Sequence, residues 1–361
     1  MKYSINDQTK APAYFQLYIQ VRDDIINGIY PTGSKLPSKR TISSDTGIST
    51  VTVEHAYALL CEEGYAEARE RSGYFVTFHV DDGFVPVTAN AQNVQNNLKT
   101  SSETNTEFPY SVLAKTMRKV ITELDRGILE KSPNLGCIPL RTALCSYLAR
   151  TKGILADIDQ VIIGSGSEYF YTVLVELLGR NRTYAIESPS YKKIQQVYSA
   201  SDVKLEQLLL ASNGIDSTEL RNSQADILHI SPYRSYPSGV TASASKRHEY
   251  LRWAEKGERY IIEDDFESEF SLTPKNVETL FSHSYRDNVI YLNTFSKTIS
   301  PSFRIGYMVL PKDLAAKYNA ELGFLSCTVP TYIQYVVAEL LSNGDFERHL
   351  NRIRRHKRKN S

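Results

Sequence analysis

The sequence predicts an α/β fold class in two units: an N-terminal winged helix-turn-helix and a larger domain with a mostly parallel sheet. Three observations support this prediction. The chain has 361 residues, more than one hydrophobic core usually holds together. Residues 1–78 combine helical spacing of apolar side chains with a short pair of strand patterns. Beyond residue 108, short apolar runs alternate with helical stretches, which is typical of α/β domains.

The composition argues against a disordered chain and against a fibrous repeat protein. Hydrophobic residues make up 41% and charged residues 23% of the chain, as in ordinary folded domains. The net charge is only +1, so a nucleic-acid surface would have to be local. The four cysteines show no paired spacing, so we expect neither a metal site nor a disulfide framework. The polar N-terminus and the lack of a long uncharged apolar run predict a cytoplasmic protein without a membrane span.

Three helices are expected in residues 1–78. Apolar residues recur at helical spacing from position 14 to position 26, and Gly28 follows as a stop. Ser38 is placed to cap a short second helix that ends at Gly47. Ser49 is placed to cap a third helix, whose inward-facing residues are expected to be Val53, Ala56, Tyr57 and Leu60. Two helices across a short turn with glycine indicate a helix-turn-helix.

The exposed face of the third predicted helix suits a DNA major groove, because its side chains are short and polar. Residues 65–76 read as two short strands around a turn, which predicts a wing. The residues expected to contact DNA are Lys35, Ser38, Lys39, Arg40, Ser49, Thr50, Thr52, His55, Arg71 and Gly73. A three-helix bundle with a hairpin and no ligand is the alternative that this pattern leaves open.

A family resemblance favours DNA binding. The strings PAYFQLYIQVRDDIINGIYPTGSKLPSKRTIS and ISTVTVEHAYALLCEEGY resemble the winged helix of the GntR superfamily, in its MocR/GabR branch. The resemblance implies double-stranded operator DNA as a partner. Two positions depart from the family: Thr50 stands where an Arg is usual, and Thr46 stands where a Leu is common. The first departure removes one strong DNA contact.

Residues 79–107 are expected to form a flexible linker. They include NAQNVQNNLKTSSETNTE, a polar string with almost no large apolar side chain to bury. The predicted domains are therefore residues 1–78 and residues 108–361.

The large domain is expected to carry its ligand where strands end. Strands are predicted at residues 161–164, 184–187, 227–230, 260–263 and 289–292, and ligands of parallel sheets gather at the carboxyl ends of strands. Ser165, Gly166 and Ser167 follow the first strand and precede a helix, which predicts a phosphate cradle. Asp264 and Asp265 directly follow a buried strand, and the residues alone leave a ligand role and a capping role open.

Lys297 lies in the string TFSKTISPSFRIG, among hydroxyl side chains and one short loop before Arg304. A partly desolvated lysine can form a Schiff base with an aldehyde, and an arginine can grip a phosphate through paired hydrogen bonds. One aldehyde cofactor with a phosphate would explain Lys297, Asp264, Arg304 and the serine-glycine turn together.

A second family resemblance names that cofactor. The strings LGCIPLRTALCSYLARTKGI, VIIGSGSEYFYTVLVELL, AIESPSYKK, SPYRSYPSG, YIIEDDFESEF and NTFSKTISPSFRIGYMVLP resemble fold-type I aminotransferases as they occur in MocR/GabR regulators. The resemblance implies that Lys297 is the catalytic residue and carries pyridoxal 5'-phosphate as an internal aldimine. It implies that Asp264 pairs with the pyridine nitrogen and that Tyr191 stacks on the ring. It implies that the phosphate is held by Gly166, Ser167, Thr294, Ser296 and Arg304.

Three positions depart from that family. Phe266 replaces a usual Tyr, and Tyr236 stands where true aminotransferases carry Asn. Glu168 replaces a usual Gln beside the phosphate turn and would repel the phosphate unless its side chain points away. The chain is also expected to stop inside the helix that leads to the family's C-terminal small domain, as a truncated product or a partial sequence. We therefore expect transamination to be impaired.

The leading hypothesis is a homodimeric transcription regulator that senses a small amine or amino acid by external aldimine formation. The alternative from the enzyme class is a working aminotransferase with an appended DNA-binding domain. A third interpretation is a degraded fragment that does neither.

Overall fold

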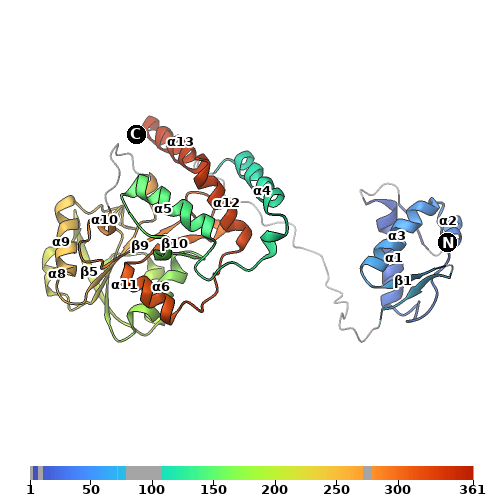
Figure 1. Cartoon of the computed structure of the whole chain (residues 1–361), viewed down its shortest axis with the longest axis horizontal. Helices are drawn as coiled ribbons and strands as arrows, with labels where there is room; N and C mark the ends of the chain where they lie inside the picture. The colour runs from blue at the N-terminus through green and yellow to red at the C-terminus, as the bar shows by residue number, and fades with distance from the viewer. Residues whose placement is uncertain (1–2, 7–10, 71, 79–107, 271–278, 361) are drawn as a thin grey trace. The chain divides into compact units, whose positions relative to one another are not determined.

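The computed structural model describes residues 3–6, 11–70, 72–78, 108–270 and 279–360 (Figure 1). The chain divides into two compact units, Met1–Ser101 and Ser102–Ser361, which are described separately. The predicted linker at residues 79–107 lies outside the described residues. Within the described ranges, no helix combines the length and the apolar character that crossing a membrane requires.

The N-terminal unit has the predicted winged helix-turn-helix. Its elements are α1 (Ala13–Ile26), α2 (Lys39–Thr46), α3 (Thr50–Glu62), β1 (Ala66–Arg69) and β2 (Gly73–Val76), and the two strands pair antiparallel. Ser38 Oγ accepts a hydrogen bond from the Thr41 amide, and Ser49 Oγ accepts one from the Thr52 amide, so both predicted caps are confirmed. Each cap satisfies a backbone donor that the helix itself leaves unpaired.

The core of this unit forms where the three helices meet. The predicted inward-facing residues of α3 are all buried, and they pack with apolar residues of α1. The Tyr57 hydroxyl donates to the carbonyl of Pro37, 2.8 Å away, which ties α3 to the segment before α2. α3, which bears the candidate DNA-contacting residues Thr50, Thr52 and His55, is therefore held in place by its packing and by this hydrogen bond.

Eight strands in the described part of the large unit form one sheet in the order β3-β10-β9-β8-β7-β4-β5-β6. The strands are β3 (Val161–Gly164), β4 (Thr183–Ser188), β5 (Lys204–Ala211), β6 (Gly214–Ile215), β7 (Ile227–Ile230), β8 (Tyr260–Asp264), β9 (Val289–Thr294) and β10 (Gly306–Val309). The pairs among β5, β4, β7, β8 and β9 are parallel, whereas β10 runs antiparallel to β3 and β9. The mostly parallel sheet is thus confirmed; β5, β6 and β10 were not predicted.

Helices cover both faces of this sheet. They are α4 (Tyr110–Leu124), α5 (Ile138–Lys152), α6 (Ser167–Leu178), α7 (Lys192–Ala200), α8 (Ser217–Asn222), α9 (Ala244–Ala254), α10 (Leu280–His283), α11 (Lys312–Glu321), α12 (Thr331–Ser342) and α13 (Asp345–Asn360). Figure 1 shows α5 and α12 on one side of β9 and β10, and α6 and α11 on the other. Val161 and Ile163 of β3 pack in a core with α5 and α12, whereas Ile162 packs with α6 and α11. This alternation is what a strand buried on both faces requires.

The sheet brings the carboxyl ends of its parallel strands to one edge. Because β3 and β9 both run antiparallel to β10, they point in the same direction, and Gly306 pairs with both Gly164 and Thr294. The carboxyl ends of β3, β9, β8, β7 and β4 therefore meet at the same edge, where open α/β sheets bind their ligands.

Candidate functional site

A cavity of about 400 Å³ lies at this edge. The eight residues that the sequence predicts for cofactor binding all line it: Gly166, Ser167, Tyr191, Asp264, Thr294, Ser296, Lys297 and Arg304. They come from five stretches of the chain, at 166–167, 191, 264, 294–297 and 304, so the convergence is a property of the fold and not of local sequence. Five further lining residues are Glu168, Tyr171, Ile194, Tyr236 and Phe266.

The turn between β3 and α6 forms one end of the cavity. Gly166 has a left-handed backbone with φ 106°, and Ser167 is the first residue of α6. A Cβ atom at Gly166 would lie 3.3 Å from Arg304 Nη2, a closer contact than side chains normally make. The positive φ therefore favours glycine at this turn, and the first amides of α6, which have no partner within the helix, can bind an anion.

Hydroxyl groups lie beside this turn. Thr294 Oγ1 is 3.0 Å from Ser296 Oγ and 3.1 Å from the carbonyl of Ile305. The Ser296 amide donates to Thr294 Oγ1. The end of β9 and the start of the following loop are thereby fixed, which places the loop that carries Lys297.

Asp264 lies at the end of β8 with only 2% of its surface exposed. Its Oδ2 accepts a short hydrogen bond from the Tyr171 hydroxyl and lies 3.6 Å from His229 Nε2. Burial and the Asp264 charge raise the pKa of Tyr171 well above its ordinary value, so this phenol remains a donor. Asp264 Oδ1 is buried and has no hydrogen-bond partner among the residues that the structure describes. A buried carboxylate oxygen without a partner is costly, so a ligand donor is expected there.

The neighbouring Asp265 plays a different part. Its Oδ2 lies 2.9 Å from Lys152 Nζ and accepts hydrogen bonds from Ser268 and Tyr291. Burial, the largest single influence, raises the pKa of this carboxyl, but the Lys152 charge and the hydrogen bonds from Ser268, Lys152 and Tyr291 together lower the pKa overall. Asp264 therefore lines the cavity, whereas Asp265 anchors the loop that follows β8.

Lys297 reaches across the cavity mouth to that loop. Its Nζ lies 2.6 Å from Glu267 Oε1 and 4.4 Å from the centre of the Phe266 ring. Arg234 Nε is 3.7 Å from the other oxygen of Glu267. About 45% of the Lys297 side chain is exposed, so its amine is open to a ligand.

Glu168 does not point away from the end of the cavity formed by Gly166 and Arg304. Its carboxylate forms ion pairs with Lys193 and with Arg304, the latter at 3.3 Å between Oε2 and Nη2. The hydrogen bond from Lys193 is the main reason that the pKa of Glu168 is lowered. The negative charge of Glu168, which was expected from the sequence to repel a phosphate, is therefore balanced by the positive charges of Lys193 and Arg304.

Tyr191 and Tyr236 face one another at the cavity wall, with ring centres 5.9 Å apart and planes at 75°. Tyr191 is the N-cap residue of α7 and stays partly exposed. Its ring can therefore stack on a planar ligand, as the sequence predicts.

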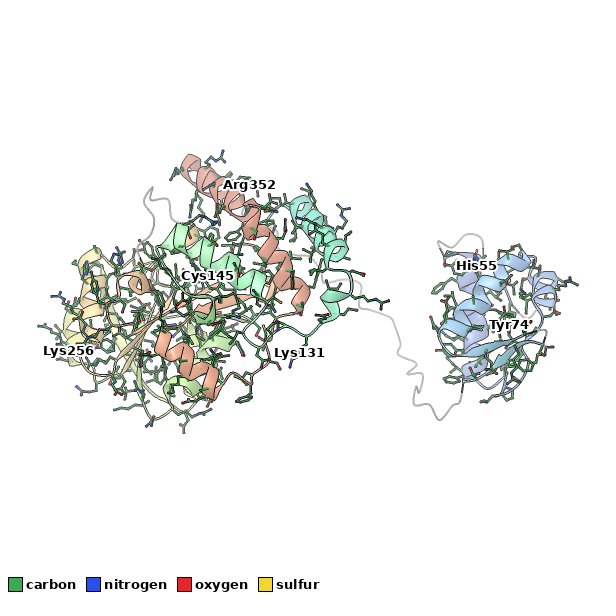
Figure 2. All side chains as sticks on the ribbon, viewed as in Figure 1. His55, Tyr74, Lys131, Cys145, Lys256 and Arg352 are labelled. Carbon is green, nitrogen blue, oxygen red and sulfur yellow. The ribbon has the colours of Figure 1, made fainter. Side chains whose placement is uncertain are left out.

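The candidate DNA-contacting residues differ in their surroundings. Thr50 and His55 are exposed on α3, and Figure 2 labels His55 in the N-terminal unit. His55 also packs edge-on against Tyr14. Ser38 and Ser49 cap helices, as described above. Lys39 pairs with Glu54 at 3.1 Å.

The remaining candidates lie beside the wing or close to these residues in the sequence. The Lys35 side chain runs beside Gly73 and the Phe75 ring. Arg40 is exposed and Thr52 is half-buried. Arg71 lies outside the described residues.

Sequence reasoning missed Tyr171, His229 and Glu267. Tyr171 reads as an ordinary apolar position of a helix, and His229 reads as part of a buried strand. Glu267 is one acid among several in EDDFESEF. Their roles depend on contacts between distant segments, and only the adjacency of Glu267 to Asp264 offered a local signal.

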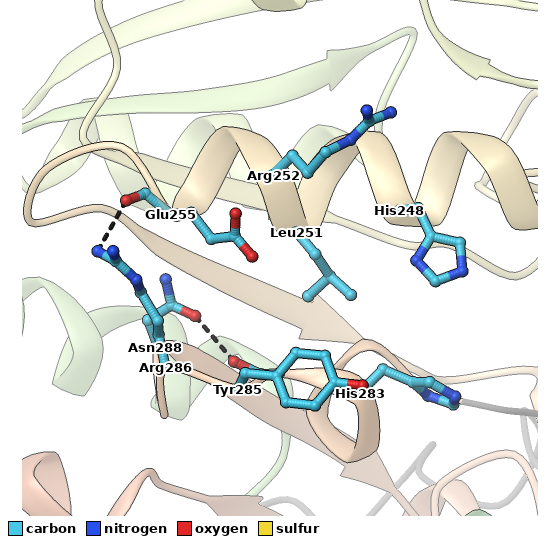
Figure 3. A pocket seen from close by; sticks show the side chains of 9 residues that line it. His248, Leu251, Arg252, Glu255, His283, Tyr285, Arg286 and Asn288 are labelled. Atoms are coloured by element: carbon cyan, nitrogen blue, oxygen red, sulfur yellow. Dashed lines mark hydrogen bonds between the residues drawn. The ribbon is translucent and has the colours of Figure 1, made fainter.

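A second hollow of about 300 Å³ lies between α9 and the segment after α10 (Figure 3). Arg286 Nη1 donates to the carbonyl of Glu255 at 2.8 Å, and Ser284 Oγ donates to Asn288 Oδ1 at 2.9 Å. None of the predicted site residues lines this hollow.

Residues 95–361 match the family described as aminotransferase class I and II, which covers most of the chain. The chain belongs to that aminotransferase family. Residues 13–76 match the bacterial regulatory proteins of the gntR family. Both resemblances predicted from the sequence are therefore confirmed, as is the order of the two domains.

The matches to curated relatives extend over both domains of this chain. It is 29% identical over 98% of its length to the uncharacterized HTH-type transcriptional regulator YdeL of Bacillus subtilis, covering 79% of that protein. It is 25% identical over 95% of its length to the probable rhizopine catabolism regulatory protein MocR of Rhizobium meliloti, covering 74% of that protein. These similarities support a DNA-binding regulator with an aminotransferase-like domain.

A solved structure shares the fold of the large unit. The kynurenine aminotransferase of Pyrococcus horikoshii matches 69% of the chain with a TM-score of 0.61 and 23% identity. The match covers 64% of that enzyme, so the chain spans less than two thirds of its length.

Proposed function

We propose that this chain is a transcription regulator that reads double-stranded DNA with α3 and the wing and binds pyridoxal 5'-phosphate in the cavity of the large unit. The observation that carries the proposal is the convergence of Lys297, Asp264 and the Gly166 turn on one cavity. A gntR-family domain lies in the same chain.

The residues of the cavity fit this cofactor. Its volume is in the range of small-molecule sites. The unpartnered Oδ1 of Asp264 would accept a hydrogen bond from the protonated pyridine nitrogen. The amides after Gly166, the hydroxyls of Thr294 and Ser296, and Arg304 would hold the phosphate. When bound, the cofactor supplies an aldehyde carbon that takes up amines reversibly and a ring that withdraws electrons.

Lys297 supports a sensing role for a small amine or amino acid. Its Nζ would hold the aldehyde carbon until an incoming amine takes its place, and the released Lys297 would return to Glu267 at the cavity mouth. A ligand that binds one arrangement of the chain better than another shifts the population toward that arrangement. We further propose that the protein acts in the cytoplasm as a homodimer, because a two-fold symmetric protein suits paired half-sites on DNA.

The first experiment loads the full chain with pyridoxal 5'-phosphate and records its visible absorbance. An imine band that is lost in Lys297→Ala and kept in Lys192→Ala supports the proposed cofactor linkage; Lys192 is an exposed lysine that does not line the cavity. A band that Lys297→Ala retains contradicts it.

The second experiment tests the regulator. Fragments of the chain's own promoter region should shift on a gel at low salt and release as salt rises, because phosphate contacts dominate such binding. Adding amines or amino acids to the loaded protein should alter the shift. No shift at any salt would contradict DNA binding, whereas rapid turnover of an amino donor with a keto acid would favour the aminotransferase alternative.

A further inference from the structure

The phosphate end of the cavity already holds a carboxylate. Glu168 is the second residue of α6, directly after the turn at Gly166 and Ser167, and it lines the cavity. Both of its oxygens are engaged: Oε1 pairs with Lys193, and Oε2 lies 3.3 Å from Arg304 Nη2. The arginine that is proposed to grip the phosphate is therefore held by an acid of the protein itself.

A phosphate beside Arg304 would therefore have a carboxylate as its neighbour. The turn at Gly166 also lies close to Arg304, because a Cβ atom added at Gly166 would be 3.3 Å from the same Nη2 atom. A phosphate seated on the amides after Gly166 and on Arg304 would lie next to the Glu168 carboxylate. Like charges at such distances oppose each other, and a single such neighbour can shift a binding or protonation equilibrium by a factor of about ten or more.

The local charge supports the same conclusion. Lys193 and Arg304 contribute two positive charges and Glu168 contributes one negative charge, so the net charge facing a phosphate dianion is +1 instead of +2. The three side chains are 35% to 55% exposed. Exposed ion pairs of this kind are weak, so Arg304 can be released from Glu168 when a stronger anion arrives.

We propose that Glu168 sets the affinity of this site for the cofactor phosphate. Its carboxylate pairs with Arg304 when no phosphate is bound. Its charge reduces the difference in affinity between pyridoxal 5'-phosphate and pyridoxal. Bound pyridoxal 5'-phosphate then dissociates faster than it would if Lys193 and Arg304 acted without the opposing charge of Glu168. This inference rests on the proposed cofactor site and assigns a specificity role to a residue within it.

The test compares Glu168→Gln with a matched control, Glu176→Gln. Glutamine keeps the size of the side chain and one acceptor for Arg304 but removes the charge. Glu176 lies on the same helix, pairs with Arg180 and does not line the cavity, so its substitution makes the same change in net charge about 12 Å further along α6. Dissociation constants of the full chain are measured for pyridoxal 5'-phosphate and for pyridoxal, with the rate of cofactor loss on dilution.

We expect Glu168→Gln to bind pyridoxal 5'-phosphate about tenfold more tightly and to lose it more slowly, because one like charge has been removed. Its affinity for pyridoxal should stay unchanged, and Glu176→Gln should match the unsubstituted chain for both compounds.

Two outcomes would overturn the inference while leaving the cofactor site intact. Weaker phosphate binding in Glu168→Gln would mean that Glu168 positions Arg304 for the phosphate. An equal effect on pyridoxal and on its phosphate, or no effect on either, would mean that the charge does not act through the phosphate. If the unsubstituted chain forms no imine band with pyridoxal 5'-phosphate, the proposed function itself fails, and this result is distinguishable from the other two.

Discussion

Lys297 Nζ lies 2.6 Å from Glu267 Oε1, so the amine proposed to hold the cofactor rests on a carboxylate of the loop after β8. That loop is anchored from beneath by Asp265, which is buried against Lys152 and Ser268. The contact between Lys297 and Glu267 must break before the amine nitrogen can reach an aldehyde carbon inside the cavity.

Glu267→Gln should therefore accelerate cofactor loading. The ion pair is nearly half exposed on the Lys297 side, so it contributes no more than about 1 kcal/mol. We expect a severalfold faster rise of the imine absorbance after mixing with pyridoxal 5'-phosphate, at unchanged final amplitude. Glu321→Gln, an exposed substitution on α11, provides the control. A slower rise in Glu267→Gln would show that the carboxylate assists loading.

Tyr171→Phe should destabilise the large unit. The substitution removes the hydroxyl that donates to Asp264 Oδ2 and leaves a buried carboxylate with one donor fewer. Such a loss costs about 1–3 kcal/mol. Trp253, the single tryptophan, is buried in this unit and reports its unfolding in urea. Tyr110→Phe, at a strongly exposed position, should leave the midpoint unchanged. An unaltered midpoint in Tyr171→Phe would contradict the structural role given to this hydrogen bond.

Particular residues mark how far the sequence could predict this site. Asp264 and Lys297 could be singled out from the residues because they lie at or just beyond the end of a strand whose apolar pattern is local, whereas Thr294 was named from the family resemblance. Ser38 and Ser49 could be predicted because a cap depends on the next three residues. β10 was missed because the run from Gly306 to Val309 is short and its antiparallel pairing is fixed by distant strands. Tyr171, His229 and Glu267 were missed because burial and pairing across the fold give them their roles.

Stability should depend on pH through Glu187. Burial raises the pKa of this carboxyl from 4.5 to about 7, although Ser235 and the Ser231 amide donate to it. A folded-state pKa above the unfolded value gives a contribution that is complete below pH 4.5 and is lost as pH rises through 7. The shift corresponds to about 3 kcal/mol.

In Glu187→Gln this titration is absent. The stability of the variant relative to the unsubstituted chain should therefore increase between pH 5 and pH 8, as followed by Trp253 fluorescence in urea. Part of the pH dependence should remain, because burial also raises the pKa of Glu263 to about 7. A constant difference between the two proteins across this pH range would contradict the assignment.

Thr50→Arg should strengthen DNA binding. Thr50 is exposed at the start of α3, where the GntR resemblance expects an arginine. One added phosphate contact should steepen the dependence of log affinity on log salt by about 1. Glu62→Gln makes the same change in net charge at the far end of α3 and serves as the control. If both variants change affinity equally, the effect is one of net charge, and the proposed contact between the start of α3 and DNA is wrong.

The most direct test of the central claim is to trap the cofactor on the protein. The full chain is loaded with pyridoxal 5'-phosphate and reduced with borohydride, which converts an imine into a stable amine. Its peptides are then analysed by mass spectrometry. We expect one modified peptide, with the cofactor on Lys297. Modification of a different lysine, or of many lysines to a similar extent, would contradict the account.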